Sequence, residues 1–212
     1  MATFLTDKCT EVRNWLAVGP DVYTDAVVTG WIRMAEEYLS TGLRVKHMVQ
    51  IDTSVLSGDR VPLPLDWQEI RLVRRLDNNG VCRYQTPDAL YNPEFPDDPN
   101  YGSDARYSRY TILGNYLIFA DASSSTTVNV EMTYYQNIPP LTNDANNWIN
   151  VYNPTVYTLK ILHIASMYSI EDARNQIWDA EVTRLVNAMN AQHQIDKASG
   201  SVLVQTRRKS FG

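Results

Sequence analysis

W-I-N-V-Y-N-P-T-V-Y-T-L-K-I-L-H-I-A-S-M-Y, residues 148–168, opens the stretch that decides the fold, and that stretch runs on to Ser199. Asn153-Pro154 predicts a helix start, because a proline in the first helical position already has a helical φ and loses no hydrogen bond. Between Pro154 and Ser199 the chain contains no further proline and no glycine. An unbroken helix of that length would be far longer than average, so we expect two helices, or one helix with a break near Ser169.

The two halves of this stretch differ in where their apolar residues lie. The first half is apolar on most sides, which is typical of a buried helix; its apolar residues are Val156, Tyr157, Leu159, Ile161, Leu162, Ile164, Ala165, Met167 and Tyr168. The second half is amphipathic, with an apolar stripe of Ile170, Ala173, Ile177, Trp178, Val182, Leu185 and Met189. We expect the first helix to fill a core, and the second to cover it with one face and leave the other for water or a neighbouring subunit.

Two shorter amphipathic helices are predicted near the N-terminus. The first spans residues 5–18, ends at Gly19-Pro20, and has Leu5, Cys9, Val12 and Leu16 on one face. The second begins at Asp21 and stops at Gly42, with an apolar stripe of Tyr23, Val27, Trp31, Met34 and Tyr38. Glu36 and Glu37 are neighbours on this helix and point about 100° apart, so they cannot converge on one substrate. We interpret both carboxylates as solvent-exposed.

The middle of the chain has the period-2 pattern of strands. Alternation over residues 45–51 predicts a strand that contains His47, and residues 67–76 and 81–84 predict two strands joined by the Asn-Gly turn at 78–80. Residues 107–113, 116–120 and 128–135 predict three more, with a hairpin at Gly114-Asn115. Thr86-Pro87-Asp88 is expected to open a single helical turn.

These elements predict an α+β fold: a helical bundle formed by N- and C-terminal helices, with an inserted antiparallel β region and an extended C-terminal tail. The expected parts are the N-terminal helices over residues 1–43, the β region over 44–141, the core helices over 142–199 and the tail over 200–212.

Composition narrows the possible classes of protein. The formal net charge of −5 does not favour a nonspecific nucleic-acid binder, because such proteins carry basic surfaces. No apolar run approaches the roughly 20 residues that span a bilayer, and the N-terminus lacks the features of a signal peptide. Cys9 and Cys82 are interpreted as reduced thiols of a protein made in the cytoplasm. We therefore expect a protein that is neither exported by a standard route nor anchored in a membrane.

The sequence contains no recognisable catalytic or metal-binding motif. None of His47, His163 and His193 has a second ligand three or four residues away, and His163 is interpreted as a core histidine. No nucleophile elbow, phosphate-binding loop or dinucleotide fingerprint occurs. We therefore expect no catalytic residue, no metal and no cofactor.

Residues 92–106 form a long loop rich in proline and acidic side chains. Its acidic and amide residues Asp97, Asp98, Asn100 and Asp104 suggest oxygen ligands for calcium, but they lack the spacing and the closing glutamate of an EF-hand. A loop of this length is expected to have a function, and a polar contact loop is the favoured interpretation.

The C-terminal tail is apolar and then basic. Its strand-forming residues are Val202, Leu203 and Val204, and they are followed by Arg207, Arg208, Lys209 and Phe211. Such a segment either pairs with another chain, by strand addition or insertion into a groove, or frays as an ordinary chain end.

Several stretches in a fixed order carry a resemblance to a known family. They are V-P-L-P-L-D-W-Q-E-I at 61–70, Y-T-I-L-G-N-Y-L-I at 110–118, M-T-Y-Y-Q-N-I-P-P-L at 132–141, N-N-W-I at 146–149, N-P-T-V-Y at 153–157, and Ile177-Trp178 in the long helical pair. From about residue 20 to 195 the chain resembles the head-to-tail adaptor, or connector, proteins of tailed bacteriophages. The family often has Tyr-Pro-Asp where this chain has Tyr152-Asn153-Pro154, so the loop before the core helix is expected to differ.

The resemblance implies a structural protein of the virion neck that is not an enzyme and is assembled in the host cytoplasm. Adaptors of this family form a ring of twelve subunits beneath the portal, and double-stranded DNA passes through the ring without specific binding. Their C-terminal segments dock on the portal, which gives this role to Val202, Leu203, Val204, Arg207, Arg208, Lys209 and Phe211. The loop residues Phe95, Asp97, Asp98 and Tyr101 are expected to contact a tail nozzle, another neck or tail protein, or a neighbouring subunit.

Three alternatives remain open at this point. The first is another neck or tail-completion protein, such as a stopper or a tail terminator. The second is a carbohydrate-binding module, which an exposed row of aromatic side chains on the sheet would favour. The third is a hydrolase with a dispersed site, which a deep pocket holding His47 or His163 beside a carboxylate would favour.

Overall fold

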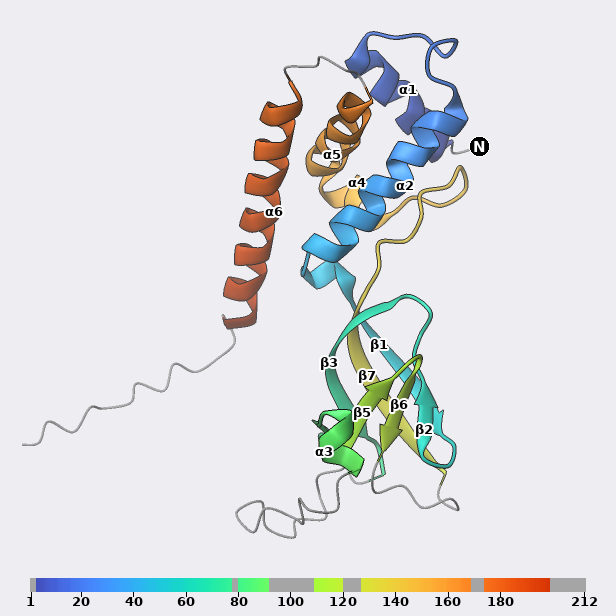
Figure 1. Ribbon diagram of the computed structural model, residues 1–212, viewed down its shortest axis with the longest axis vertical. Helices are drawn as coiled ribbons and strands as arrows, with labels where there is room; N and C mark the ends of the chain where they lie inside the picture. Colours follow the sequence, from blue (N-terminus) through green and yellow to red (C-terminus); the bar gives the residue numbers. More distant parts are fainter. Residues whose placement is uncertain (1–2, 78–79, 92–108, 120–126, 169–173, 199–212) are drawn as a thin grey trace, which may run out of the picture. The chain divides into compact units, whose positions relative to one another are not determined.

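The computed structural model describes residues 3–77, 80–91, 109–119, 127–168 and 174–198. The chain divides into two compact units: a helical unit (Met1–His47 and Ile138–Gly212) and a sheet unit (Met48–Asn137). Figure 1 shows that the helical unit combines elements from both ends of the chain, whereas the sheet unit comes from its middle. The presence of helices together with antiparallel and mixed sheets confirms the predicted α+β class.

The helical unit contains the long stretch that decides the fold. Its helices are α1 (Phe4–Leu16), α2 (Asp25–Gly42), α4 (Trp148–Tyr152), α5 (Pro154–Met167) and α6 (Asn175–Ala198). As predicted, α5 begins at Pro154, and α6 is a second helix rather than a continuation of α5. Helix α1 ends at Leu16, before the predicted Gly19-Pro20 stop, because Ala17 adopts a left-handed φ of 55°.

Helix α5 lies at the centre of the helical unit. It contacts α1, α2, α4 and α6, and Figure 1 shows it between α2 and α6. Its side chains Tyr157, Ile161 and Leu162 are fully buried, as expected for a helix that is apolar on most sides. Each such side chain stabilises the fold by about 1.5–3 kcal/mol relative to an exposed one.

The predicted apolar stripe of α2 was wrong in part: Trp31 is buried, but three other members of the stripe are not. Val27, Met34 and Tyr38 are exposed, and the face turned to the core consists of Val28, Trp31, Ile32, Ala35, Glu36, Leu39 and Ser40. Similarly, Ile177 was placed on the buried stripe of α6 and is exposed, whereas Trp178 and Val182 are buried as predicted. Both helices are apolar on more than one face, and periodicity alone does not tell which face the core covers.

The sheet unit packs a three-stranded and a four-stranded sheet over one core. The first sheet has the order β1 (Val49–Leu56), β7 (Val128–Gln136), β3 (Trp67–Arg75). The second has the order β2 (Arg60–Pro62), β6 (Tyr116–Phe119), β5 (Arg109–Leu113), β4 (Arg83–Tyr84). The short helix α3 (Pro87–Tyr91) begins where the single helical turn was predicted. The core side chains come from both sheets and are Leu56, Val61, Leu63, Val73, Cys82, Tyr110, Leu117, Phe119, Val128, Val130, Met132 and Tyr134.

Two strand predictions need correction. The first strand begins at Val49 rather than Val45, because residues Lys46–Met48 form a 3-10 turn (η1) that contains His47. Strand β4 pairs with β5 in parallel, so the sheet unit is not purely antiparallel. The predicted turn at Gly114 is confirmed, and the chain also turns at Gly58; both glycines have the positive φ that such turns require, 59° and 68°. In the described part of the chain, no helix has the length and apolarity needed to cross a membrane.

Candidate assembly surfaces and the polar network behind them

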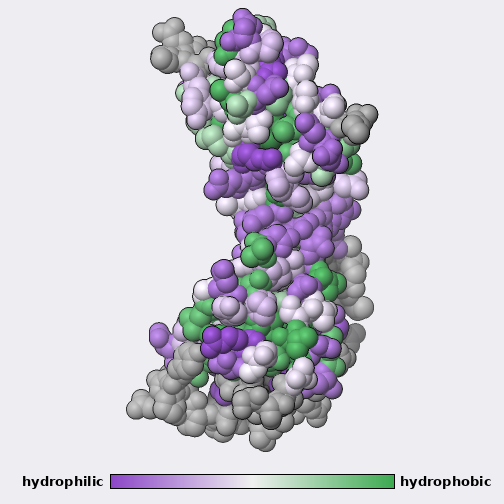
Figure 2. Space-filling model, turned by 90° about the vertical axis from the view of Figure 1, so that its right-hand side faces the viewer, coloured by the Kyte–Doolittle hydropathy of each residue, from purple (hydrophilic) through white to green (hydrophobic). Residues whose placement is uncertain are grey.

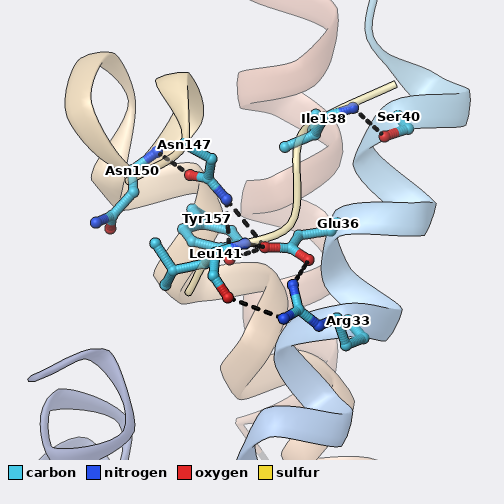
Figure 3. A network of polar contacts seen from close by, with 8 residues as sticks. All are labelled: Arg33, Glu36, Ser40, Ile138, Leu141, Asn147, Asn150 and Tyr157. Carbon is cyan, nitrogen blue, oxygen red and sulfur yellow. Dashed lines mark hydrogen bonds and ion pairs between the residues drawn. The ribbon is translucent and has the colours of Figure 1, made fainter. Parts of the chain in front are cut away.

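A buried carboxylate, Glu36 on α2, is the centre of the polar network that Figure 3 shows. Only 4% of Glu36 is exposed. Its Oε1 accepts hydrogen bonds from the Leu141 N–H at 2.8 Å, Asn147 Nδ2 at 2.9 Å and the Tyr157 hydroxyl at 2.7 Å. Its Oε2 accepts from Arg33 Nη1 at 2.8 Å. The interpretation of Glu36 as a solvent-exposed carboxylate was therefore wrong; Glu37 is exposed as predicted.

The network fastens the chain segment 138–147 to α2. Arg33 donates a second hydrogen bond from Nη2 to the carbonyl of Leu141, at 2.9 Å. One turn further along α2, the Ser40 hydroxyl accepts a hydrogen bond from the Ile138 N–H at 2.9 Å. This irregular segment has no helix or strand to satisfy its backbone, so the side chains of α2 satisfy it instead. The segment is the path by which the chain re-enters the helical unit.

Asn147 connects the network to the start of α4. Its side-chain oxygen accepts a hydrogen bond from the Asn150 N–H at 3.0 Å, which is the N-cap contact that the first turn of a helix requires. Its Nδ2 group donates to Glu36. One buried amide thus caps one helix and binds a carboxylate on another.

Tyr157 joins α5 to the same carboxylate. Burial, and next the charge of Glu36, raise the pKa of Tyr157 far above that of a free phenol. The hydroxyl therefore remains protonated and keeps donating to Glu36 across the physiological range. Four donors surround the Glu36 carboxylate, so we interpret it as a structural anchor rather than a general base.

The outer face of α2 is apolar and exposed. Val27, Met34 and Tyr38 lie at spacings of seven and four residues, which places them along one side of the helix. Tyr168, just after α5, extends this surface, since its hydroxyl lies 3.9 Å from the Met34 sulfur. We call these four residues the outer α2 face.

A glycine in the interior of α2 interrupts the outer α2 face. Gly30 costs the helix about 1 kcal/mol relative to alanine. Apart from its own chain neighbours and helix backbone, no atom of the described residues lies within 4 Å of the position that a Cβ would take there. Contacts within the described part of the chain therefore do not account for a glycine at this position, whereas the close approach of a second backbone would.

The sheet unit also exposes apolar side chains. On the side shown in Figure 2, hydrophobic residues in green interrupt the hydrophilic surface of this unit in the lower part of the picture. The most exposed is Leu65, at 99%, which lies on a turn between β2 and β3. That turn is held by a hydrogen bond from the Asn137 N–H to the Asp66 carbonyl at 2.8 Å, and by one from the Tyr134 hydroxyl to Asp66 Oδ1 at 3.1 Å.

Within the described residues, the contacts of His47 and His163 do not match those of a hydrolase site. His47 stacks on Tyr152, with ring centroids 4.3 Å apart. His163 lies 3.2 Å from Asp179, an arrangement that also occurs in catalytic triads. However, the nearby Ser166 hydroxyl donates to the His163 backbone carbonyl and not to the imidazole ring, so it is not activated as a nucleophile.

The remaining predicted site residues lie outside the described part of the chain. This holds for the tail residues Val202, Leu203, Val204, Arg207, Arg208, Lys209 and Phe211, and for the loop residues Phe95, Asp97, Asp98, Asn100, Tyr101 and Asp104. Sequence reasoning missed the Glu36 network. A usable signal was the position of Glu36 four residues after Ile32 and three before Leu39, on the side of α2 that those residues bury.

Comparison with known families gives one match that covers most of the chain. The model of the SU10 adaptor protein family matches residues 5–206, which leaves four residues unmatched at the start and six at the end. A search of curated proteins finds no match.

Proposed function

The chain belongs to the SU10 adaptor protein family, a family of phage head-to-tail adaptors, and from this membership we propose that it forms a ring beneath the portal. The protein is a structural component of the virion neck. In our proposal the ring joins the capsid to the tail and extends the channel through which DNA leaves the capsid. The helices from the two chain ends form the bundle of each subunit, and the sheet unit is the inserted β region.

The observation that carries this proposal is the extent of the family match. The match includes both the helical and the sheet unit, so it concerns the whole architecture rather than one local motif. The buried Glu36 carboxylate is occupied by backbone, amide, phenol and guanidinium donors, which fits a structural role for this residue.

The outer α2 face supports assembly with further copies of the chain. A helix that is apolar on two faces is normally covered on both. Within the described residues α2 is covered on one face, by contacts with α5 and α1, while Val27, Met34 and Tyr38 remain exposed. In a ring of identical subunits such a face packs against a different face of the next copy. We propose that the ring contains twelve subunits, as in the adaptors that the sequence resembles.

The tail is the proposed portal-binding segment. Helix α6 ends at Ala198, so 14 residues follow it. An extended segment of that length spans up to about 45 Å, which is enough to reach a neighbouring protein. Val202, Leu203 and Val204 are suited to strand addition or to an apolar groove, and Arg207, Arg208 and Lys209 to an acidic rim. The loop residues Phe95, Asp97, Asp98 and Tyr101 are proposed to contact the tail side of the neck or the next subunit.

Co-sedimentation with the portal protein of the same phage tests this function. The full-length chain should form a large complex with the portal, and a chain truncated after Gly200 should lose it while keeping its own fold by circular dichroism. Formation of the complex by both chains would overturn the role of the tail but not the adaptor function. Absence of a complex with either chain would count against a position next to the portal.

A further inference from the structure

One imidazole nitrogen in the helical unit lies close to both a hydrogen-bond donor and a hydrogen-bond acceptor. His163 and Lys160 lie one turn apart on α5, and Asp179 lies on α6. The Nδ1 atom of His163 is 3.2 Å from Lys160 Nζ and 3.2 Å from Asp179 Oδ1. An ammonium group can only donate a hydrogen bond, and a carboxylate can only accept one. Nδ1 therefore binds Lys160 when it carries no proton, and Asp179 when it does.

Whether Nδ1 of His163 carries a proton matters because Lys160 is buried and Asp179 is not. Lys160 is 4% exposed, and its ammonium group lies 3.3 Å from the centre of the Tyr38 ring on α2. The side chain of His163 is 12% exposed, whereas that of Asp179 is half exposed. A buried ammonium group needs an acceptor, so it depends on the lone pair of Nδ1 more than the solvated carboxylate depends on the Nδ1 proton.

Within the described residues, the charged and titratable groups with contacts at His163 are Lys160 from α5, Asp179 from α6 and, through Lys160, Tyr38 from α2. Burial, and next the Lys160 charge, lower the pKa of His163, while Asp179 opposes this change. Burial also lowers the pKa of Lys160, and Asp179 again opposes it. The neutral imidazole is thus favoured at pH 7.

We propose that His163 is a proton-controlled switch, whose Nδ1 atom contacts Lys160 within α5 when neutral and Asp179 on α6 when protonated. Protonation replaces a contact inside one helix by an ion pair between two helices. It also leaves two cations, the imidazolium and the Lys160 ammonium, next to each other. Acidification therefore strengthens the polar contact between α5 and the first turns of α6, at a net cost in the stability of the helical unit.

A second polar attachment of α6, made by Asn190, does not titrate. The Asn190 side chain accepts a hydrogen bond from the Arg44 N–H at 2.7 Å and donates one to the Gly42 carbonyl at 2.9 Å. It holds the second half of α6 at the end of α2. The switch acts near the start of α6, close to Asp179, and the hydrogen bonds of Asn190 to Arg44 and Gly42 are not affected by it.

Nitrogen-15 NMR of the imidazole rings in the full-length chain between pH 5 and 8 tests the switch. His163→Gln identifies the His163 signals among those of the three histidines. We expect His163 to titrate below pH 6.5, with Nδ1 unprotonated above the transition and protonated below it. If Nδ1 is protonated on both sides of the transition, the switch does not exist. This measurement on the wild-type chain decides the question even if the variants below fail to fold.

Two substitutions test the partners. Lys160→Met removes the cation and should raise the pKa of His163, and Asp179→Asn removes the carboxylate and should lower it further. Glu181→Gln, on the same helix and paired with Arg184, is the matched control and should leave the titration nearly unchanged. A titration that responds equally to Asp179→Asn and Glu181→Gln, or does not respond to Lys160→Met, would overturn the proposal. The outcome is independent of portal binding, so it does not bear on the proposed function.

Discussion

At the scale of single residues, adjacent glutamates on α2 have opposite environments. Glu36 lies in the interior and accepts four hydrogen bonds from three parts of the chain, whereas Glu37 lies in water. The difference arises because successive helical residues are turned by about 100°, enough to move a side chain from the buried face to the exposed one. A buried charge is tolerated only where donors replace its hydration shell.

Removing the Glu36 carboxylate should therefore destabilise the protein strongly. Glu36→Ala leaves the Arg33 guanidinium, the Asn147 amide and the Tyr157 hydroxyl without their shared acceptor, so we expect the free energy of unfolding to fall by about 3–5 kcal/mol. The matched control Glu37→Ala should change it by no more than about 0.5 kcal/mol. Urea denaturation followed by circular dichroism measures both, and similar losses for the two variants would contradict the anchoring role.

A second residue-scale prediction concerns alkaline pH. Burial, and next the hydrogen bond and charge of Asp66, raise the pKa of Tyr134 to about 12. An unfolded phenol ionises near pH 10, so the stabilisation is fully present below pH 10 and is lost as the pH rises towards 12. Burial likewise raises the pKa of Tyr110 to about 12.

The measurement is the free energy of unfolding between pH 9 and 12. It should decline over this range, and Tyr134→Phe should make the decline shallower, by on the order of 2 kcal/mol in total. Tyr116→Phe, on an exposed side chain of β6, is the control and should leave the slope unchanged. An identical slope for the two variants would show that Tyr134 does not couple to folding.

At the scale of elements, α2 serves two surfaces. Its inner face carries Val28, Ile32 and Leu39 into the core, and its outer face exposes Val27, Met34 and Tyr38. Helix α6 has a similar division, with Trp178 and Val182 buried and Ile177 and Ile195 exposed. Each helix holds the subunit together with one side, and its other side is available for a neighbour.

Substitution of Gly30 should change the stability of the subunit and the assembly of the ring in opposite directions. Gly30→Ala should raise the stability of the isolated subunit by up to about 1 kcal/mol, because alanine favours the helix and its Cβ meets no atom of the described chain. If the outer α2 face lies between subunits of the ring, the same change should weaken assembly. Thermal unfolding of the subunit and sedimentation velocity of the assembly measure the two effects.

Met34→Glu on the same face should abolish assembly with little loss of subunit stability, because a charge would be buried without a partner only in the ring. Unimpaired rings for both α2 variants would place the subunit contact on another surface.

At the scale of the whole molecule, the family match identifies a phage head-to-tail adaptor, and the chain is organised in two compact units. Both chain ends belong to the helical unit, and the sheet unit comes from the middle of the chain. The proposed contacts of such a protein are distributed among the outer α2 face, the loop 92–106 and the tail, rather than gathered in one pocket.

Charge reversal in the tail tests its contact with the portal. Glutamate at Arg207, Arg208 and Lys209 should weaken docking, and more strongly at low salt, because salt screens exposed charges beyond about 10 Å at 0.1 M. Binding to immobilised portal at several ionic strengths measures this. Equal affinity of the altered and the wild-type chain at low salt would show that the basic residues do not contribute.

The sequence by itself determined the features that depend on the properties of residues close together in the chain. Pro154 set the start of α5 because of its fixed φ, Gly58 and Gly114 set turns because they accept positive φ, and near-uniform apolarity marked α5 as buried. The sequence stretches that follow one another in a fixed order between residues 61 and 178 also indicated the adaptor family, which the match over residues 5–206 confirms.

Only the tertiary structure decided which sides of the helices face the core. Val27 and Val28 are the same residue type and adjacent, yet one is exposed and the other buried, because the position of α5 selects the face. The role of Glu36 depends on Leu141, Asn147 and Tyr157, which are more than 100 residues away in the sequence. The parallel pairing of β4 with β5 and the contact of His163 with Asp179 likewise arise from long-range packing, which local periodicity does not encode.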